Sequence, residues 1–247
     1  VAGGDITQIV NNYQGMDEEE LRRVVEKILP ELLVSKLSDL GIGSQSHSED
    51  KELTPEEEGG VDQALEDAKA VEEAGIEFDP WEYITLGHAA ILRGRTFTAE
   101  RYYREAQRLF VEIGDRHGES HSLNGLGKIA NRRGDLDEAE SLHRESLAIK
   151  REIGGRHGEA SALGSLGNVA IRRGDLHEAE RLYREALRLS VEDGDRHDES
   201  VTLGNLGMIA SILGDLEEAE RLKRESLAIR REVGDRLGEA SVLGNLG

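Results

Sequence analysis

A chain of 247 residues with 37% hydrophobic and only 4% aromatic residues can bury a core of Leu, Ala, Val and Ile, which suits packed helices better than sheets. The formal net charge is -20, and residues 49–79 carry -11 of it through thirteen acidic residues and two lysines; this balance argues against nucleic acid as a partner, because phosphate contacts need clustered Lys and Arg. No cysteine is present, which excludes disulfides and thiolate metal sites, and no apolar run is long enough to span a bilayer, so we expect a cytoplasmic protein without a membrane partner.

The first forty residues predict a short extended segment followed by helices. Residues 1–15 are polar and tolerate a β conformation, which indicates an extended segment or a linker. Residues 16–40 form an amphipathic helical segment, in which apolar residues recur at helical spacing after the capping residues Asp17 and Glu20. Pro30 lies inside this run and is expected to divide it into two helices, because proline lacks the N–H that a helix interior needs.

Residues 41–59 have the composition of an acidic flexible linker. They are rich in Gly, Ser and carboxylates, and such a segment cannot bury enough apolar surface to offset the entropy of ordering it. We therefore expect it to be mobile. The helices before it are expected either to pack on the first hairpin of the following domain or to pair with a second copy of the chain.

From residue 60 to 247 the sequence repeats with a period of forty residues. The same string, RRGDLDEAE in its second copy, ends at equivalent positions: Glu100, Glu140, Glu180 and Glu220. The expected organisation is a degenerate half-repeat, four repeats and a truncated repeat, over residues 60–77, 78–117, 118–157, 158–197, 198–237 and 238–247. Because the first residue is Val and the last repeat is incomplete, we expect this chain to be a fragment of a longer polypeptide.

Each period predicts two helices from the spacing of apolar residues. In the first helix these residues recur every three or four positions, as Leu123, Leu126, Ile129 and Ala130. In the second helix the predicted buried stripe is Ala139, Leu142, Ser146, Ile149 and Ile153. Arg144, Glu145 and Lys150 lie off this stripe and are expected to face water.

Glycine and acidic residues mark the expected ends of these helices. A left-handed glycine should end the first helix of each hairpin, at Gly134, Gly174 and Gly214. The residue that follows should form a capping box with a Glu three positions later, in the pairs Asp135 and Glu138, Asp175 and Glu178, and Asp215 and Glu218. One hairpin cannot bury both of its apolar stripes, so neighbouring hairpins must stack into a superhelical solenoid.

The repeat resembles the tetratricopeptide repeat. Leu126, Gly127, Ala139 and Ser146 have the spacing of that family. The period of forty, instead of the usual thirty-four or so, resembles the long-helix subgroup typified by the LGN/Pins spindle-orientation adaptors and the kinesin light chains. The sequence departs from the family at Asp193, which occupies a slot that is apolar in the neighbouring repeats, and at Arg95, which replaces the capping acid.

This resemblance implies an all-α fold, a right-handed superhelical solenoid of antiparallel helix pairs. It also implies a non-enzymatic protein-protein interaction module that binds a peptide or protein segment on its concave face, as the sensor or adaptor arm of a larger multidomain protein. The alternative is a structural spacer or a self-association scaffold, which would form homo-oligomers through the N-terminal helices or the exposed C-terminal repeat.

The residues that the resemblance places on the concave face differ between repeats, whereas the packing residues do not. The candidate peptide-binding residues are Trp81, His88, His121, Asn124, Lys128, Asn131, Arg132, Asn168, Arg172, Asn205 and Met208. Asn168, Asn205 and Asn245 resemble an Asn ladder of the subgroup, and Arg132 and Arg172 could form a basic rail. We expect an extended ligand with acidic residues near its middle and apolar anchors at its ends, held by Ile84, Ile91, Val201 and Met208.

No catalytic, cofactor or metal site is expected. His117 and His121 flank Glu119 at a spacing that could hold a metal ion, but the next two repeats replace His121 with Ser161 and Val201. No phosphate-binding glycine loop occurs, and no nucleophile has a neighbouring base. We therefore predict neither a cofactor nor an enzymatic activity.

Overall fold

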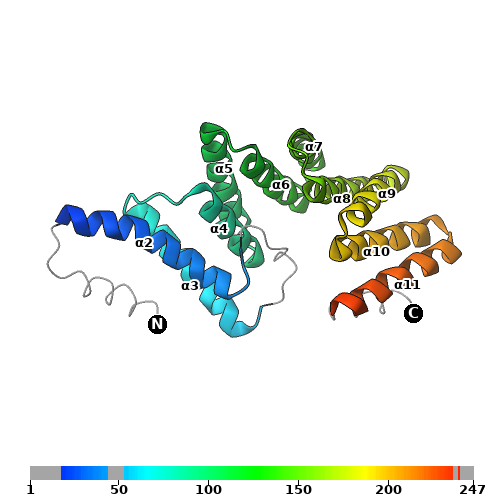
Figure 1. Ribbon diagram of the computed structural model, residues 1–247, viewed down its shortest axis with the longest axis horizontal. Helices are drawn as coiled ribbons and strands as arrows, with labels where there is room; N and C mark the ends of the chain where they lie inside the picture. Colours follow the sequence, from blue (N-terminus) through cyan, green and yellow to red (C-terminus); the bar gives the residue numbers. More distant parts are fainter. Residues whose placement is uncertain (1–17, 44–52, 236–238, 240–247) are drawn as a thin grey trace. The chain divides into compact units, whose positions relative to one another are not determined.

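The computed structural model describes residues 18–43, 53–235 and 239. Within this part of the chain there are ten α-helices and no strand, which confirms the predicted all-α fold class (Figure 1). The chain divides into two compact units, Val1–Ala106 and Gln107–Gly247, and the boundary falls inside helix α5. Residues 1–15 and most of the truncated repeat at 238–247 lie outside the described residues.

The first unit contains α2 (Glu18–Asp39), α3 (Pro55–Glu73), α4 (Pro80–Leu92) and most of α5 (Thr96–Ile113). Helix α2 packs on both α3 and α4. Leu33, Leu37 and Ile42 are buried at its C-terminal end. The segment thus packs on the first hairpin through α4, which is one of the two arrangements expected, and pairing with a second copy stays a prediction.

The prediction that Pro30 divides this segment into two helices is wrong. Helix α2 runs unbroken through Pro30, which is itself buried. A proline removes one backbone hydrogen bond from a helix interior. Burial of Leu33 and Leu37 on the following helices offsets that loss, because both side chains reach the core only if the helix continues past the proline.

The expected linker at 41–59 is shorter than predicted at both ends. Ile42 is buried, and Pro55 already begins α3. The Thr54 hydroxyl accepts a hydrogen bond from Glu57 N, the Glu57 carboxylate accepts one from Thr54 N, and Pro55 occupies the first helical position. This is a complete capping box, and a segment that looked disordered by composition is therefore helical from residue 55. Residues 44–52 lie outside the described part.

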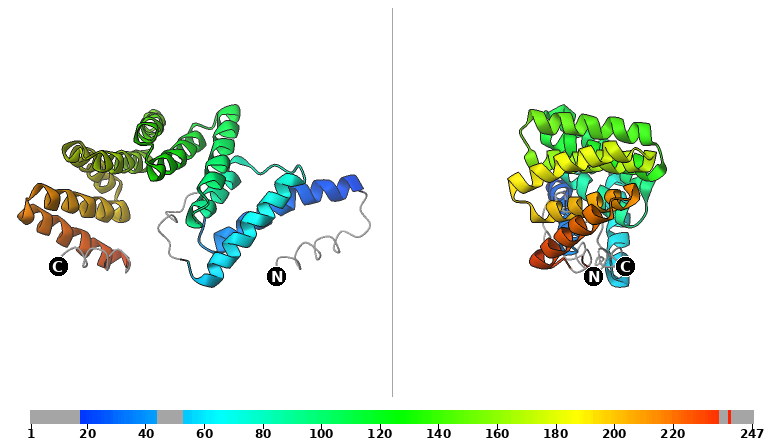
Figure 2. Two further views of the ribbon diagram at one scale, coloured as in Figure 1. Left: turned by 180° about the vertical axis from the view of Figure 1, so that it is seen from behind. Right: turned by 90° about the vertical axis from the view of Figure 1, so that its right-hand side faces the viewer.

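The second unit is built from three successive hairpins, which Figure 1 shows from one side and Figure 2 from behind. Their helices are α6 (Arg116–Arg133), α7 (Leu136–Glu152), α8 (Arg156–Arg173), α9 (Leu176–Asp193), α10 (Arg196–Leu213) and α11 (Leu216–Val233). Within each hairpin the two helices pack together, and neighbouring hairpins meet where α7 contacts α8 and α9 contacts α10. The first-helix stripe is buried as predicted; Leu123, Ile129 and Leu163 are at most 1% exposed.

The helix ends agree with the prediction at glycine and only partly at the acidic caps. Gly134, Gly174 and Gly214 end α6, α8 and α10 in the left-handed region. Asp175 and Asp215 accept the expected hydrogen bonds from Glu178 N and Glu218 N.

The glutamate half of these predicted capping boxes is not made. The carboxylates of Glu178 and Glu218 instead accept hydrogen bonds from Arg181 and Arg221, one turn further along their helices. Asp135 makes no side-chain cap. Its carboxylate accepts from Arg133 across the turn. Each arginine donates two hydrogen bonds to the carboxylate of its glutamate, whereas the backbone amide of the cap would donate one, which explains the exchange at Glu178 and Glu218.

The predicted stripe of the second helix is wrong at its C-terminal end. Lys150, expected to face water, is 4% exposed, and Ile153, expected to be buried, is 40% exposed. Helix α7 ends at Glu152, so Ile153 already lies in the turn. The equivalent Val233 is 45% exposed as well. Asp193 therefore occupies an exposed position in place of an exposed apolar residue, and its departure from the family pattern disturbs no core.

Glycine on each first helix allows the second helix to approach closely. A Cβ atom at Gly127 would lie 2.6 Å from the His143 ring, and one at Gly167 would lie 2.7 Å from the Tyr183 ring. Both distances are far below van der Waals contact. The Leu-Gly pair of the repeat is therefore a packing requirement. None of the described helices combines the length and apolar character that a membrane crossing requires.

Candidate functional site

The candidate surface is formed by the outward side chains of α6, α8 and α10, and we call it the first-helix face. Contacts of α8 with both α6 and α10 make it continuous within the second unit. Two side-chain hydrogen bonds also join α6 to α8. Ser165 Oγ donates to Asn124 Oδ1 at 3.3 Å, and Arg172 Nη1 donates to Asn131 Oδ1 at 2.8 Å.

The asparagines of this face use their oxygen atoms within the protein. Besides Asn124 and Asn131, Asn168 accepts a hydrogen bond of 2.7 Å from the hydroxyl of Tyr183. Burial of that phenol raises the pKa of Tyr183 well above its ordinary value, so it remains a donor. The Nδ2 groups of the three asparagines make no hydrogen bond among the described residues, so that two N–H donors of each remain available.

The charges of the first-helix face are less neutralised than those elsewhere in the second unit. In the described part of the second unit, most arginines pair with a carboxylate, as Arg184 on α9 does with Glu180. The exceptions are Arg132, Arg156 and Arg172, all exposed. Arg132 and Arg172 occupy equivalent positions, forty residues apart, on α6 and α8. Together they give this part of the face an unbalanced positive charge.

The face becomes apolar on the third hairpin. Ile212 replaces the arginine of the two preceding repeats and is 57% exposed. Met208 lies one turn earlier on α10 and is 39% exposed. Asn205 is half-buried on the same helix. The surface therefore changes from basic and amide-rich on α6 and α8 to apolar on α10.

The structure does not bring all the predicted residues to this face. Trp81 and His88 belong to α4 in the first unit, and His88 Nδ1 lies 2.8 Å from the carbonyl oxygen of Gly43. Ile84 and Ile91, expected as apolar anchors, are 1% and 4% exposed. They pack in the core of the first hairpin because α4 is apolar on more than one face, and they are not available to a ligand.

The remaining predicted residues are placed as follows. His121 is half-buried on α6, and its ring stacks edge to face on His117 with centroids 4.7 Å apart. Lys128 is half-buried one turn before Arg132. Asn245 lies outside the described residues.

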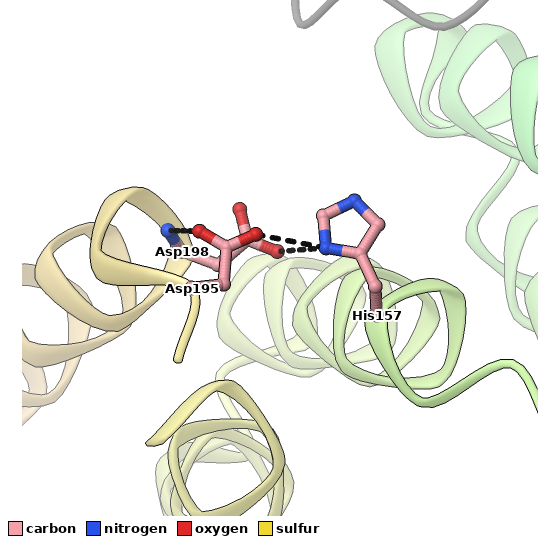
Figure 3. Close-up of side chains that lie close together, drawn as sticks. All are labelled: His157, Asp195 and Asp198. Atoms are coloured by element: carbon pink, nitrogen blue, oxygen red, sulfur yellow. Dashed lines mark hydrogen bonds and ion pairs between the residues drawn. The ribbon is translucent and has the colours of Figure 1, made fainter. Parts of the chain in front are cut away.

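Sequence reasoning missed a cluster between repeats, formed by His157, Asp195 and Asp198 (Figure 3). His157 Nδ1 lies 2.9 Å from Asp195 Oδ2 and 3.9 Å from Asp198 Oδ2. The other oxygen of Asp195 accepts from Asp198 N and caps α10. The signal was present in the turns between hairpins, because His157 in one turn precedes the capping Asp195 of the next turn by 38 residues. The contact joins the N-termini of α8 and α10.

A groove of 740 Å³ lies on a different surface of the second unit, between α7, α8 and α9. Its floor includes the core residues Leu163 and Leu166. Four arginines line it: Arg144, Arg151, Arg173 and Arg181. Each of them pairs with carboxylates of the described residues, as Arg151 does with Glu159 and Glu185. These ion pairs balance the charge of the groove, in contrast to the first-helix face.

Comparison with known proteins gives a family match over most of the repeat region. The family model described as Tetratricopeptide repeat matches residues 82–152, 123–192, 158–232 and 198–247. No curated protein sequence matches the chain.

Three solved structures illustrate the similarity in fold. A Rap protein complexed with Competence and Sporulation Factor has a TM-score of 0.67 at 14% identity, over 75% of this chain and 53% of that chain. A kinesin light chain-like protein with nearly identical TPR-like repeats, from Podosopora anserina, has a TM-score of 0.60 at 15% identity, over 83% of this chain and 98% of that chain. A signal transduction ATPase with numerous domains and a tetratricopeptide repeat sensor, from Pyrococcus horikoshii, has a TM-score of 0.62 at 18% identity, over 90% of this chain and 36% of that chain. At these identities the likeness establishes the fold, as predicted from the repeat pattern.

Proposed function

This chain belongs to the tetratricopeptide repeat family, and we propose that it is a non-enzymatic protein-interaction module whose first-helix face binds an extended acidic segment of a partner protein. The observation that carries the proposal is the pair Arg132 and Arg172. In a chain with a net charge of -20, these two exposed guanidinium groups have no carboxylate partner among the described residues, and they recur in register.

Each of these arginines can bind a carboxylate in a bidentate manner. Because both are exposed, each contact would contribute only about 1 kcal/mol, and the affinity would fall as salt is added. Arg172 is already held by Asn131, which reduces the entropy that it loses on binding. The basic pair therefore selects an acidic ligand without holding it tightly.

The amide groups beside the arginines suit an extended backbone. The N–H donors of Asn124, Asn131 and Asn168 can bind peptide carbonyl oxygens, which makes recognition independent of side-chain identity at those points. Met208 and Ile212 would receive an apolar residue at one end of the ligand. The ligand that fits is acidic in its middle, extended, and apolar at the end that reaches α10.

The solved structures support this proposal by analogy. The Rap protein was crystallised with Competence and Sporulation Factor, and the Pyrococcus horikoshii ATPase carries its repeats as a sensor. This chain matches only 36% of that ATPase. We propose a comparable role here, as the sensor or adaptor arm of a larger protein.

The test uses a fluorescent peptide with a central run of Glu and an apolar end, and a matching peptide with Gln in place of Glu. Binding is measured by fluorescence anisotropy for the wild type and for the double variant Arg132→Glu, Arg172→Glu. The control is Arg184→Glu, Arg224→Glu, which makes the same charge change at two exposed positions that are also forty residues apart. We expect the first variant to lose binding of the Glu peptide and the control to keep it. Equal affinities for the Glu and Gln peptides would refute the proposal.

Self-association is the second candidate function. It is favoured by Leu213 and Leu216, which are 43% and 70% exposed at the turn between α10 and α11. Sedimentation equilibrium of the wild type and of Leu216→Ser distinguishes the two functions. A dimer that the substitution dissociates would favour the scaffold, and a monomer at all concentrations would exclude it.

A further inference from the structure

One helix start in the second unit lacks the carboxylate that its counterparts carry. The residue before the first helix of a repeat is Asp115, Gly155, Asp195 or Asp235 in successive repeats. Asp115 and Asp195 cap α6 and α10 by accepting hydrogen bonds from Gly118 N and Asp198 N. Gly155 has no side chain to do so, and α8 begins without a side-chain cap. The amide of Gly158, which would be capped, has no side-chain acceptor.

The side chains that donate to the equivalent aspartates at other junctions nevertheless have counterparts around Gly155. At the next junction, shown in Figure 3, Asp195 accepts from His157 of the preceding repeat at 2.9 Å. At the last junction, Asp235 accepts from Arg230 of the helix before it at 2.8 Å. The residues equivalent to His157 and Arg230 at the Gly155 junction are His117 and Lys150. Both positions therefore keep a nitrogen-bearing side chain, and only the carboxylate between them is missing.

Lys150 is buried and directed at this helix start. It is 4% exposed, and its ammonium group makes no hydrogen bond or ion pair with any described residue. Its stem lies against the first turn of α8, since a Cβ atom at Gly158 would be 2.5 Å from Lys150 Cδ and 3.1 Å from Nζ. A buried ammonium group without a counterion is strongly unfavourable, and it is rare in folded proteins.

The electrostatic environment is consistent with a missing anion. Burial lowers the pKa of Lys150 to about 8. Among the described residues, the carboxylate that opposes this shift is Asp115, which is already used as the cap of α6. The pKa of His117 is also lowered, first by burial and then by Lys150. Arg156, the first residue of α8, is exposed and has no carboxylate partner in the described part of the chain. Lys150 and Arg156 thus place two positive side chains at the first turn of α8, where the helix dipole is also positive.

The space that a side chain at residue 155 would enter is open near the backbone. A Cβ atom at Gly155 would meet nothing closer than 3.8 Å, and the backbone there has φ -83 and ψ 81, close to the φ -78 and ψ 90 of Asp195. An aspartate would fit at residue 155 without strain, and so would a small anion in its place.

We propose that the start of α8 is a binding site for a small oxyanion, which occupies the place of the missing aspartate and is held by the amides of the first turn of α8 together with Lys150 and Arg156. Amides at a helix N-terminus and a lysine ammonium are the donors that phosphate, sulfate and carboxylate ions use in proteins. The site lies in the turn between hairpins and does not include Arg132 or Arg172, so it is independent of the function proposed above.

The experiment titrates phosphate into the full chain and follows the amide NMR resonances of His157 and Gly158 at constant ionic strength, with chloride as the balancing ion. Parallel titrations with sulfate and acetate establish which oxyanion binds best. We expect a saturable shift of both resonances in the wild type. Gly155→Ala adds a Cβ atom without a carboxylate and should keep the shift.

Two variants should remove the site in different ways. Gly155→Asp supplies the carboxylate from within the chain and should abolish the phosphate response while raising the melting temperature. Lys150→Met keeps the buried stem and removes the charge, and should weaken binding roughly 10- to 100-fold, the loss of one hydrogen bond to a charged group. The proposal is overturned if the wild type shows no saturable shift with any of the three oxyanions, if Gly155→Asp responds like the wild type, or if Lys150→Met binds phosphate unchanged.

Discussion

Lys150 is the residue whose environment departs furthest from its sequence pattern. It lies off the apolar stripe of α7, yet the neighbouring hairpin covers it completely. Equivalent positions hold Phe110, Ser190 and Arg230 in the other repeats, so the site tolerates apolar, small and charged side chains. The size of side chain that this position accepts depends on the first turn of the helix that follows.

The pH dependence of stability should reveal the buried ammonium. In the folded state the pKa of Lys150 falls from its ordinary value to about 8, mainly through burial. The unfolded chain therefore binds more protons between about pH 8 and pH 10.5, and stability rises with pH across that window. Below pH 8 the group is charged in both states, and its burial costs about 3 kcal/mol.

Lys150→Met should consequently be more stable than the wild type by up to about 3 kcal/mol at pH 7, with the difference shrinking as pH rises towards 10.5. Urea unfolding followed by circular dichroism at several pH values, in chloride buffers free of oxyanions, measures this. Parallel stability curves for the two proteins would show that the ammonium is not desolvated.

Pairs of helices are fitted to each other through small residues at fixed positions. Phe110 and Lys150 are large residues near the ends of α5 and α7. Each faces a glycine in the first turn of the helix that follows: Gly118 in α6 faces Phe110, and Gly158 in α8 faces Lys150. Where that residue is the small Ser190, the first turn carries an aspartate instead. Size at one position thus compensates size at the other.

Gly167→Ala should destabilise the chain although alanine is the better helix former. The new Cβ atom would lie 2.7 Å from the Tyr183 ring, and that ring is held by its hydrogen bond to Asn168. We expect a loss of about 1 to 3 kcal/mol from overpacking. The matched control is Gly164→Ala in the same helix, where a Cβ atom meets nothing within 4 Å. This control should gain about 0.5 to 1 kcal/mol in free energy of unfolding, and its melting temperature should rise slightly. Equal effects of the two substitutions would mean that the close approach is not real.

One large hydrophobic cluster joins the three hairpins of the second unit, and a smaller one of Ala130, Ala139 and Val169 joins the first hairpin to α8. The cluster around Leu166 extends from Leu147 in the first hairpin to Ile229 in the third. Each hairpin nevertheless packs only on its neighbours, so the stability of the unit is a sum of hairpin and interface terms. The central hairpin, α8 and α9, takes part in both interfaces.

Leu166→Ala should therefore weaken all three hairpins. Leu166 is 6% exposed in the central hairpin, and truncation should cost about 2 to 5 kcal/mol. Hydrogen exchange should show reduced protection from α6 to α11, with a lower melting temperature by circular dichroism. Leu216→Ala serves as the control, because Leu216 is 70% exposed and its truncation should change stability by less than about 0.5 kcal/mol. A loss of protection confined to α8 would show that the hairpins unfold independently.

The period, the paired helices and the glycine turns could be predicted from the sequence, because each depends on residues within a few positions of one another. The helical spacing of Leu123 and Leu126, and the glycine that follows each first helix, are local signals of this kind. The Arg and Asn positions of the first-helix face on α6 and α8 followed from the same register. The domain boundaries and the ligand remain predictions.

Which polar residues are buried, and which charges lack partners among the described residues, depends on how the helices pack together. Pro30 stays helical because α3 and α4 cover the helix beyond it, and Ile84 is buried by elements outside its own helix. Periodicity locates a side chain on a helix face, but whether water, a neighbouring helix or a counterion meets that face depends on residues far away in the sequence. For that reason the unpaired Arg132 and Arg172, and the buried Lys150 facing the uncapped start of α8, could be recognised only after the hairpins were placed together.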